Sequence, residues 1–136
     1  MNKVELAPYI FFKGNCREAM EFYQSVFGGE LRLQTMSQVP ENARIAGSKP
    51  EHIMHARLDG GLVILMASDS QNASAHSAKV ELSLSGSDET SLRDVFNKLS
   101  KGGVIKMALS KAPWGSLFGQ LTDKYGVEWM LNIYHS

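Results

Sequence analysis

Residues 8–14 read Pro8-Tyr9-Ile10-Phe11-Phe12-Lys13-Gly14, an apolar run that ends in a glycine and predicts a β-strand. Asn15 follows, with Glu18 three residues later, which is the pattern of a capped helix start. Apolar residues then recur at the spacing of one helical face, namely Ala19, Phe22, Tyr23, Val26 and Phe27. Gly28 and Gly29 end the predicted helix, because glycine accepts the left-handed C-terminal conformation at no steric cost.

The second half of the chain repeats this plan at a nearly constant offset. Residues 80–86 alternate between apolar and polar, as in a strand with one buried face. Ser87-Asp88-Glu89 can begin a helix, and an apolar stripe follows it at Leu92, Val95, Phe96 and Leu99. Gly102 and Gly103 end this second predicted helix.

Three strand-like runs follow each predicted helix, so each half reads β-α-β-β-β. They are residues 30–36, 52–58, 62–67, 104–109, 117–122 and 128–134. Residues 39–50 are expected to form a loop, and Asp59-Gly60-Gly61 is a hairpin signal. The polar segment 69–77 is expected to link a first module at about 4–68 to a second at about 78–134. Neither half could bury a full core alone, so residues 1–136 are expected to form a single domain.

Composition excludes several classes of protein. Fourteen Lys and Arg balance fourteen Asp and Glu, which argues against nucleic-acid binding and against attraction to anionic membranes. No apolar run is long enough to span a bilayer, and Glu5 interrupts the start where a signal peptide would be apolar. The single Cys16 cannot form an internal disulfide or a cysteine-rich zinc site. We therefore expect a reduced, cytoplasmic protein.

Two tandem β-α-β-β-β units in this length resemble the vicinal-oxygen-chelate superfamily of glyoxalases, bleomycin-resistance proteins and extradiol dioxygenases. Residues 18–29 look like its first-helix signature. Residues 114–130, with residues 8–12 and 52–56, resemble the PhnB-like branch, which is often labelled 3-demethylubiquinone methyltransferase-like. The resemblance covers residues 8–133. It implies an α+β fold in which two βαβββ modules form a curved mixed sheet around a cavity, with helices on the outer face. It also implies a homodimer.

Strand alternation predicts which side chains face this cavity. The expected cavity-facing set is Tyr9, Phe11, Ile53, His55, Arg57, Glu81, Ser83, Ser85, Glu128, Met130 and Asn132. The expected helix-facing set is Ile10, Phe12, Met54, Ala56, Leu58, Val80, Leu82, Leu84, Trp129, Leu131 and Ile133.

In metal-dependent members, the resemblance implies His or Glu ligands on the first and last strands of each module. Here those strands offer Tyr9 and Phe11, no carboxylate or imidazole in residues 62–67, then Glu81, and Met130 or Asn132. This count predicts no metal site and no cofactor. His55 could join Glu81 only if the two modules shared a centre.

The candidate catalytic residues are Glu81 and His55, each with an ordinary alternative. Glu81 could be a solvated carboxylate rather than a base, and His55 a hydrogen-bonded edge residue. Trp114 could anchor its loop or contact another subunit, while the resemblance favours a cavity lid. Cys16, near a helix start, could be activated, but a small residue that begins the helix is the simpler interpretation.

These observations favour a metal-independent protein that binds a small, partly aromatic or apolar molecule. The predicted ligand-binding residues are Tyr9, Phe11, His55, Glu81, Trp114, Phe118, Met130 and Asn132. A metal-dependent glyoxalase- or dioxygenase-like enzyme acting on vicinal oxygens is the alternative, and a dimeric structural protein with a vestigial cavity is a third hypothesis. Methyl transfer is disfavoured, because the pairs at Gly28 and Gly60 are helix-end and hairpin glycines rather than a nucleotide-binding loop.

Overall fold

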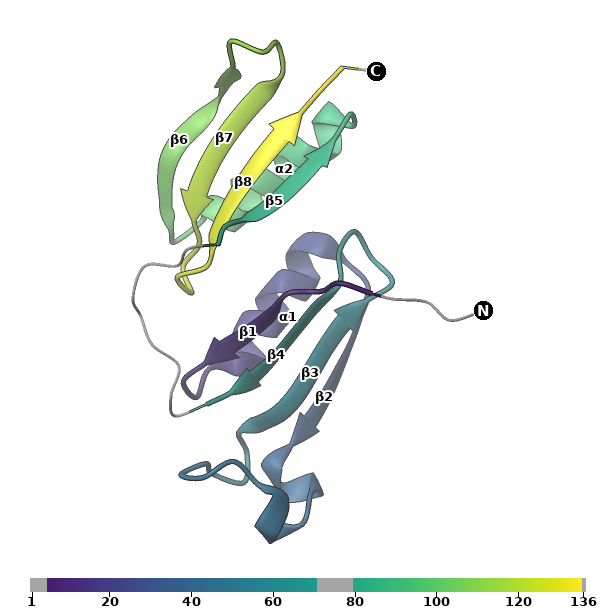
Figure 1. Ribbon diagram of the computed structural model, residues 1–136, viewed down its shortest axis with the longest axis vertical. Helices are drawn as coiled ribbons and strands as arrows, with labels where there is room; N and C mark the ends of the chain where they lie inside the picture. Colours follow the sequence, from purple (N-terminus) through teal and green to yellow (C-terminus); the bar gives the residue numbers. More distant parts are fainter. Residues whose placement is uncertain (1–4, 71–79, 136) are drawn as a thin grey trace. The chain divides into compact units, whose positions relative to one another are not determined.

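The computed structural model describes residues 5–70 and 80–135, and the chain divides into two compact units, Met1–Ser74 and Ala75–Ser136. Within the described residues, each unit contains one α-helix and one four-stranded mixed sheet (Figure 1). This confirms the predicted α+β fold with two repeated modules. The single domain and the module boundaries at about 4–68 and 78–134 stay predictions.

The two modules have the same strand order. The first contains β1 (Tyr9–Phe12), α1 (Cys16–Phe27), β2 (Glu30–Thr35), the short 3-10 helices η1 (Met36–Gln38) and η2 (Glu41–Ala43), β3 (Ile53–Asp59) and β4 (Leu65–Asp69). The second contains β5 (Leu82–Gly86), α2 (Glu89–Ser100), β6 (Val104–Lys111), β7 (Leu117–Thr122) and β8 (Glu128–Ile133). The sheets run β1-β4-β3-β2 and β5-β8-β7-β6, with only the β1–β4 and β5–β8 pairs parallel. The sequence repeat is therefore a structural repeat.

One helix covers one face of each sheet. In the first module α1 packs against β2, β3 and β4, and in the second α2 packs against β7 and β8. The core side chains come from these faces, and they include Met20, Tyr23, Phe27, Ala56, Leu58, Phe96, Leu99, Leu121, Trp129 and Leu131. We call the other side of each sheet its open face.

Within the described residues, neither α1 nor α2 is long and apolar enough to cross a membrane.

Strand alternation holds along most of the chain. On β1, Phe12 is buried while Tyr9 and Phe11 are exposed, and on β8 buried and half-buried residues alternate as expected. The prediction for Ile53 and Met54 was wrong. Thr35 pairs with Ile53 while Gln34 pairs with His55, so Met54 is an extra residue at a β-bulge. The bulge shifts the alternation by one, which turns Ile53 into the core, where it is fully buried.

The buried carboxylate of Asp69 joins three parts of the first module. Its Oδ1 accepts hydrogen bonds from the Gly14 and Cys16 N–H groups at 2.9 and 3.0 Å, and its Oδ2 accepts one from the Ile53 N–H at 2.8 Å. The side chain of Asn15 makes no capping bond, so the expected local cap is replaced by a residue from β4. Asp69 is also the last residue of β4, not the first of the linker; residues 71–77 of that predicted linker lie outside the described residues.

The burial of the helix start beside Asp69 also affects the protonation of the Cys16 thiol. Burial, followed by the charge of Asp69, raises the pKa of the Cys16 thiol to about 12. The thiol therefore stays protonated at neutral pH, and the interpretation of Cys16 as a small helix-start residue is the one that fits.

The second module has its own buried carboxylate. Asp123 Oδ1 accepts from the N–H groups of Tyr125 and Val127 at 2.8 and 3.1 Å, and Oδ2 accepts from the indole Nε1 of Trp129 at 2.8 Å. These bonds shape the β7–β8 turn and orient the largest core side chain of the module.

Gly29 and Gly103 are the second glycines of the pairs that follow α1 and α2. Each lies directly against the hairpin that joins the last two strands of its module. A Cβ on Gly29 would overlap backbone atoms of Asp59 and Gly61, and a Cβ on Gly103 would overlap backbone atoms of Thr122 and Asp123. Only a residue without a side chain fits there, so the Gly-Gly repeat marks a close approach as well as a helix end.

Replacing Asp69 with Asn should destabilise the protein by about 1–3 kcal/mol, because the amide nitrogen would face an N–H group that has no other acceptor. Urea denaturation followed by circular dichroism measures this change. Asp94→Asn alters the same functional group on the exposed surface of α2 and should leave the midpoint nearly unchanged. Equal midpoints for Asp69→Asn and the wild type would contradict the structural role of Asp69.

Gly103→Ala should cost about 1–3 kcal/mol, because the new methyl group meets backbone that cannot rotate away. Gly86→Ala is the matched control, since its methyl would meet only the flexible end of Leu92 at 3.2 Å and neither glycine has a positive φ. Thermal unfolding of both variants tests this difference. A Gly103→Ala variant as stable as Gly86→Ala would show that the hairpin does not need the close approach.

Candidate functional site

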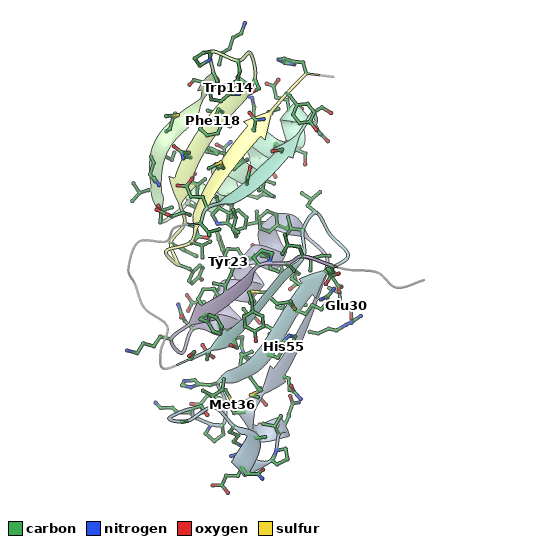
Figure 2. All side chains as sticks on the ribbon, viewed as in Figure 1. Tyr23, Glu30, Met36, His55, Trp114 and Phe118 are labelled. Carbon is green, nitrogen blue, oxygen red and sulfur yellow. The ribbon has the colours of Figure 1, made fainter. Side chains whose placement is uncertain are left out.

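The predicted site residues fall into two groups, one in each module; His55 of the first group and Trp114 and Phe118 of the second are labelled in Figure 2. Tyr9 and Phe11 on β1 and His55 on β3 belong to the first module. The second module holds the other five, which are Glu81, Trp114, Phe118, Met130 and Asn132. The two-residue period of a strand brings Tyr9 and Phe11 to one side of the first sheet, and Met130 and Asn132 to one side of the second. Trp114 lies in a turn and Glu81 just before β5.

Tyr9, Phe11 and His55 form an aromatic cluster in the first module. The ring centroid of Tyr9 lies 5.1 Å from that of Phe11 and 5.9 Å from that of His55. Tyr9 and Phe11 keep 40% and 58% of their surface exposed. Aromatic rings left uncovered on a strand can stack against a bound ring, so this cluster offers an apolar wall.

Arg57 lies next to this wall. It is in register with Met66, which also pairs with Tyr9, and its Nη1 approaches the Met66 sulfur at 3.7 Å. Its guanidinium also donates to Asp59 Oδ2 at 2.7 Å and to the Glu5 carboxylate at 3.0 and 3.1 Å. The hydrogen bonds to Glu5 and Asp59 raise the pKa of Arg57 above its usual value. The positive charge is therefore fixed in place and balanced by two carboxylates.

In the second module an aromatic pair stands beside an amide. Trp114 lies in the β6–β7 turn, and its ring centroid is 5.5 Å from that of Phe118, with an interplanar angle of 74°. Asn132 is the cross-strand partner of Phe118, and Met130 is on the same face. Ser116 Oγ donates to Asn132 Oδ1 at 2.6 Å, and the Trp114 indole donates to the same oxygen at 3.4 Å. Trp114 nevertheless stays 65% exposed, so most of its ring is free to contact another molecule.

A charged group lies farther along the same face. Lys106 Nζ is 3.0 Å from Glu81 Oε1 and 3.2 Å from Glu128 Oε1, while Gln120 Nε2 donates to Glu81 Oε2 at 2.9 Å. The hydrogen bond from Lys106 outweighs the effect of burial and lowers the pKa of Glu81; the same bond raises the pKa of Lys106. A general base that acts near neutral pH needs a raised pKa, so this geometry favours a binding role for Glu81.

The donors on these faces do not fit a divalent metal ion. Where the resemblance places ligands, the first module has Tyr9 and Phe11, and Glu81 in the second is engaged by Lys106. Asp69 adds a carboxylate to β4, but three backbone N–H groups occupy it. In the part of the chain that is described, no three His, Cys, Asp or Glu side chains converge as metal ligands. A divalent ion needs such a set.

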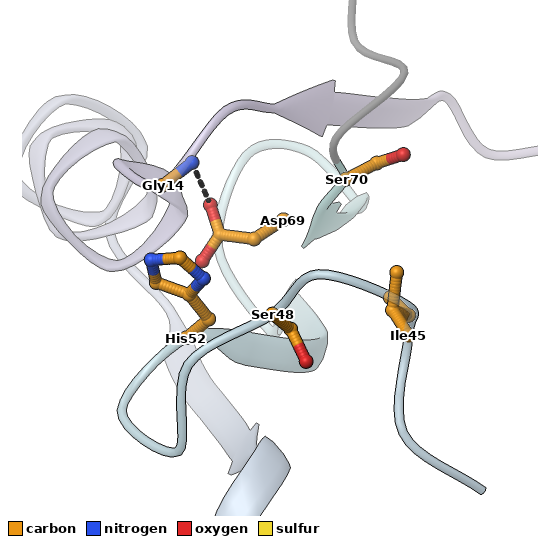
Figure 3. Close-up of a pocket in the computed structure, with 6 residues that line it drawn as sticks. All are labelled: Gly14, Ile45, Ser48, His52, Asp69 and Ser70. Atoms are coloured by element: carbon orange, nitrogen blue, oxygen red, sulfur yellow. Dashed lines mark hydrogen bonds between the residues drawn. The ribbon is translucent and has the colours of Figure 1, made fainter.

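A shallow pocket opens beside the start of α1 (Figure 3). It is lined by Gly14, Ile45, Ser48, His52, Asp69 and Ser70. The Asp69 carboxylate holds the backbone there, and His52 Nδ1 accepts a hydrogen bond from the Lys49 N–H at 3.2 Å. None of the predicted site residues lines this pocket, and its polar groups support the loop before β3.

Three residues that complete the second group were not predicted. Gln120 would have followed from the alternation of residues 117–122, since it is two positions from Phe118. Lys106 lies in a predicted strand, but its contact with Glu81 depends on the curvature of the sheet. Ser116 carries no signal in the sequence, because its bond to Asn132 exists only once the β6–β7 turn lies against β8.

Comparison with known proteins identifies a family, a curated relative and solved structures that are similar to this chain. The model of a family described as 3-demethylubiquinone-9 3-methyltransferase matches residues 4–132. Protein YjdN of Escherichia coli strain K12 is 30% identical over 138 residues, covering 94% of each chain. The crystal structure of protein PA1353 from Pseudomonas aeruginosa is 35% identical, with a TM-score of 0.83, and the match covers 98% of this chain and 100% of that one.

A second solved structure, described as a putative 3-demethylubiquinone-9 3-methyltransferase, PhnB protein, from Bacillus cereus, is 29% identical. It has a TM-score of 0.75, over 96% of this chain and 100% of that one. A glyoxalase/bleomycin resistance protein/dioxygenase family enzyme from Burkholderia phytofirmans shares only the fold, at 16% identity and a TM-score of 0.62, over 96% and 98% of the two chains. The chain therefore belongs to the PhnB-like family described as 3-demethylubiquinone-9 3-methyltransferase, and it has the fold of the glyoxalase/bleomycin resistance/dioxygenase proteins.

Proposed function

We propose that this protein binds a small, partly aromatic molecule on the open face of the second module without the help of a metal ion. The observation that carries the proposal is the exposed Trp114 ring, set edge-on to Phe118 and beside the hydrogen-bonding groups of Asn132 and Ser116. Apolar surface next to a few fixed polar groups is the usual composition of a small-molecule site.

The energetics support this role for Trp114. An exposed indole that becomes covered gains about 25 cal/mol for each Å² of apolar surface removed from water. An aromatic ligand that stacks on Trp114 and meets the edge of Phe118 gains about 0.5–1.5 kcal/mol more from ring geometry. The hydrogen bond to Asn132 holds the indole in place, which reduces the entropy that binding would otherwise cost.

The alternative activities have less support from these residues. A metal-dependent glyoxalase or dioxygenase needs converging ligands, and Glu81 is engaged by Lys106. Methyl transfer is the activity named in the family description, yet Gly28 and Gly60 have the positive φ of a helix end and a hairpin. Tyr9, Phe11 and His55 form an apolar wall on the open face of the first module, and we propose it as a separate binding surface of that module. A homodimer and a cytoplasmic location remain predictions.

Thermal unfolding in the presence of a panel of aromatic compounds tests the proposal. A ligand at 100 times its dissociation constant should add about 2.7 kcal/mol to the stability of the wild type. Trp114→Ala should weaken the same ligand about tenfold or more, because stacking and burial are lost. Leu62→Ala removes a similarly exposed apolar side chain from the first module and should leave binding unchanged.

Two results would contradict the proposal. Equal shifts for the wild type and Trp114→Ala would place the ligand elsewhere. A clear rise in melting temperature with one divalent ion, and none with aromatic compounds, would favour the metal-dependent enzyme instead.

A further inference from the structure

Two side-chain amides on the open face of the second module have fixed orientations. The oxygen of Asn132 faces both the Ser116 hydroxyl and the Trp114 indole N–H. An indole N–H only donates, so the Asn132 atom that it meets must be the oxygen, Oδ1. The Nδ2 group of Asn132 therefore points away from both partners, and among the described residues nothing accepts a hydrogen bond from it.

Gln120 is oriented in the opposite sense. Its Nε2 donates to the Glu81 carboxylate at 2.9 Å, and Glu81 is held as an anion by Lys106. A carboxylate only accepts, so the Gln120 nitrogen faces Glu81 and the oxygen Oε1 faces away. In the described part of the chain, no group donates to Gln120 Oε1.

The amides of Asn132 and Gln120 lie beside the aromatic pair of Trp114 and Phe118, and the sheet register sets their spacing. Phe118 is directly opposite Asn132, and Gln120 is two residues farther along β7. Diagonal neighbours of this kind lie roughly 7–8 Å apart on the face of a sheet. The two residues that carry the donor and the acceptor are thus spaced on the scale of a substituted aromatic ring, beside Phe118 and Trp114.

From this geometry we infer the class of ligand: a small aromatic compound with a carbonyl-type oxygen at one end and a hydroxyl or amine donor at the other. Asn132 Nδ2 donates to the ligand oxygen, Gln120 Oε1 accepts from the ligand donor, and the ring lies in the corner formed by Trp114 and Phe118. This inference rests on the proposed function and adds the polarity of the ligand to it. A site that places a fixed donor against an oxygen discriminates against an analogue without that oxygen, because the bound analogue covers the donor and leaves it unpaired.

Two probes that differ only at the carbonyl group test the inference. They are para-hydroxyacetophenone and para-ethylphenol, compared in mildly acidic buffer in which both phenols are neutral. Binding is measured by isothermal titration calorimetry and by the change in tryptophan fluorescence; Trp129 is buried, so Trp114 is the tryptophan that the probe can contact. We expect the wild type to bind para-hydroxyacetophenone about tenfold more tightly than para-ethylphenol.

Asn132→Asp is the decisive variant. An aspartate keeps the shape of the side chain and still accepts from Ser116 and Trp114, but it has no donor to offer the ligand. The variant should lose the preference for para-hydroxyacetophenone and keep its affinity for para-ethylphenol. Asn97→Asp makes the same change on the exposed surface of α2 and should keep the wild-type preference.

The outcomes separate this inference from the proposed function. Equal affinity of the wild type for the two probes, or a preference that survives in Asn132→Asp, overturns the inference while binding itself stands. No binding of either probe overturns the proposed function together with the inference. The comparison of the two probes on the wild type needs no variant, so a misfolded Asn132→Asp would still leave a decisive measurement.

Discussion

One α-helix can cover only one face of a four-stranded sheet, and the described residues of each module form one such helix and one such sheet. The hydrophobic core therefore lies mainly between α1 and its sheet, and between α2 and its sheet, with Met36 of η1 also fully buried. The other face of each sheet carries aromatic and polar side chains that no helix of its own module covers. The candidate site follows from this constraint, because these are the side chains left available for another molecule.

Two buried carboxylates, one in each module, hold parts of their own module together from inside the fold. Asp69 holds the starts of α1 and β3, and Asp123 holds the β7–β8 turn and the Trp129 indole. Both work inside the fold through backbone N–H groups or a core side chain, where an unpaired donor would be costly. On the open face of the second module, Asn132 and Gln120 each use one end of the side-chain amide for a contact within the module, and no described group bonds the other end.

The pattern of the sequence predicted most of the fold, since periodicity, glycines and caps act over a few residues. It failed where one extra residue or one distant partner decided the outcome. The bulge at Met54 moved Ile53 into the core, and Asp69 replaced Asn15 as the cap of α1 across more than fifty residues. In the site, alternation brought Met130 and Asn132 to one face, but it could not show that the β6–β7 turn sets Trp114 and Ser116 beside Asn132, or that Lys106 meets Glu81.

By itself the sequence determined the repeated β-α-β-β-β plan and the separation of each strand into a packed and an open side, because a strand alternates every two residues. The tertiary structure alone decided how the side chains of the open faces bond to one another. Whether Glu81 is a base or an ion-paired anion, and which atom of Asn132 faces outward, depends on partners from other strands. Such contacts leave no periodic trace in the sequence, since they form only after the strands have paired.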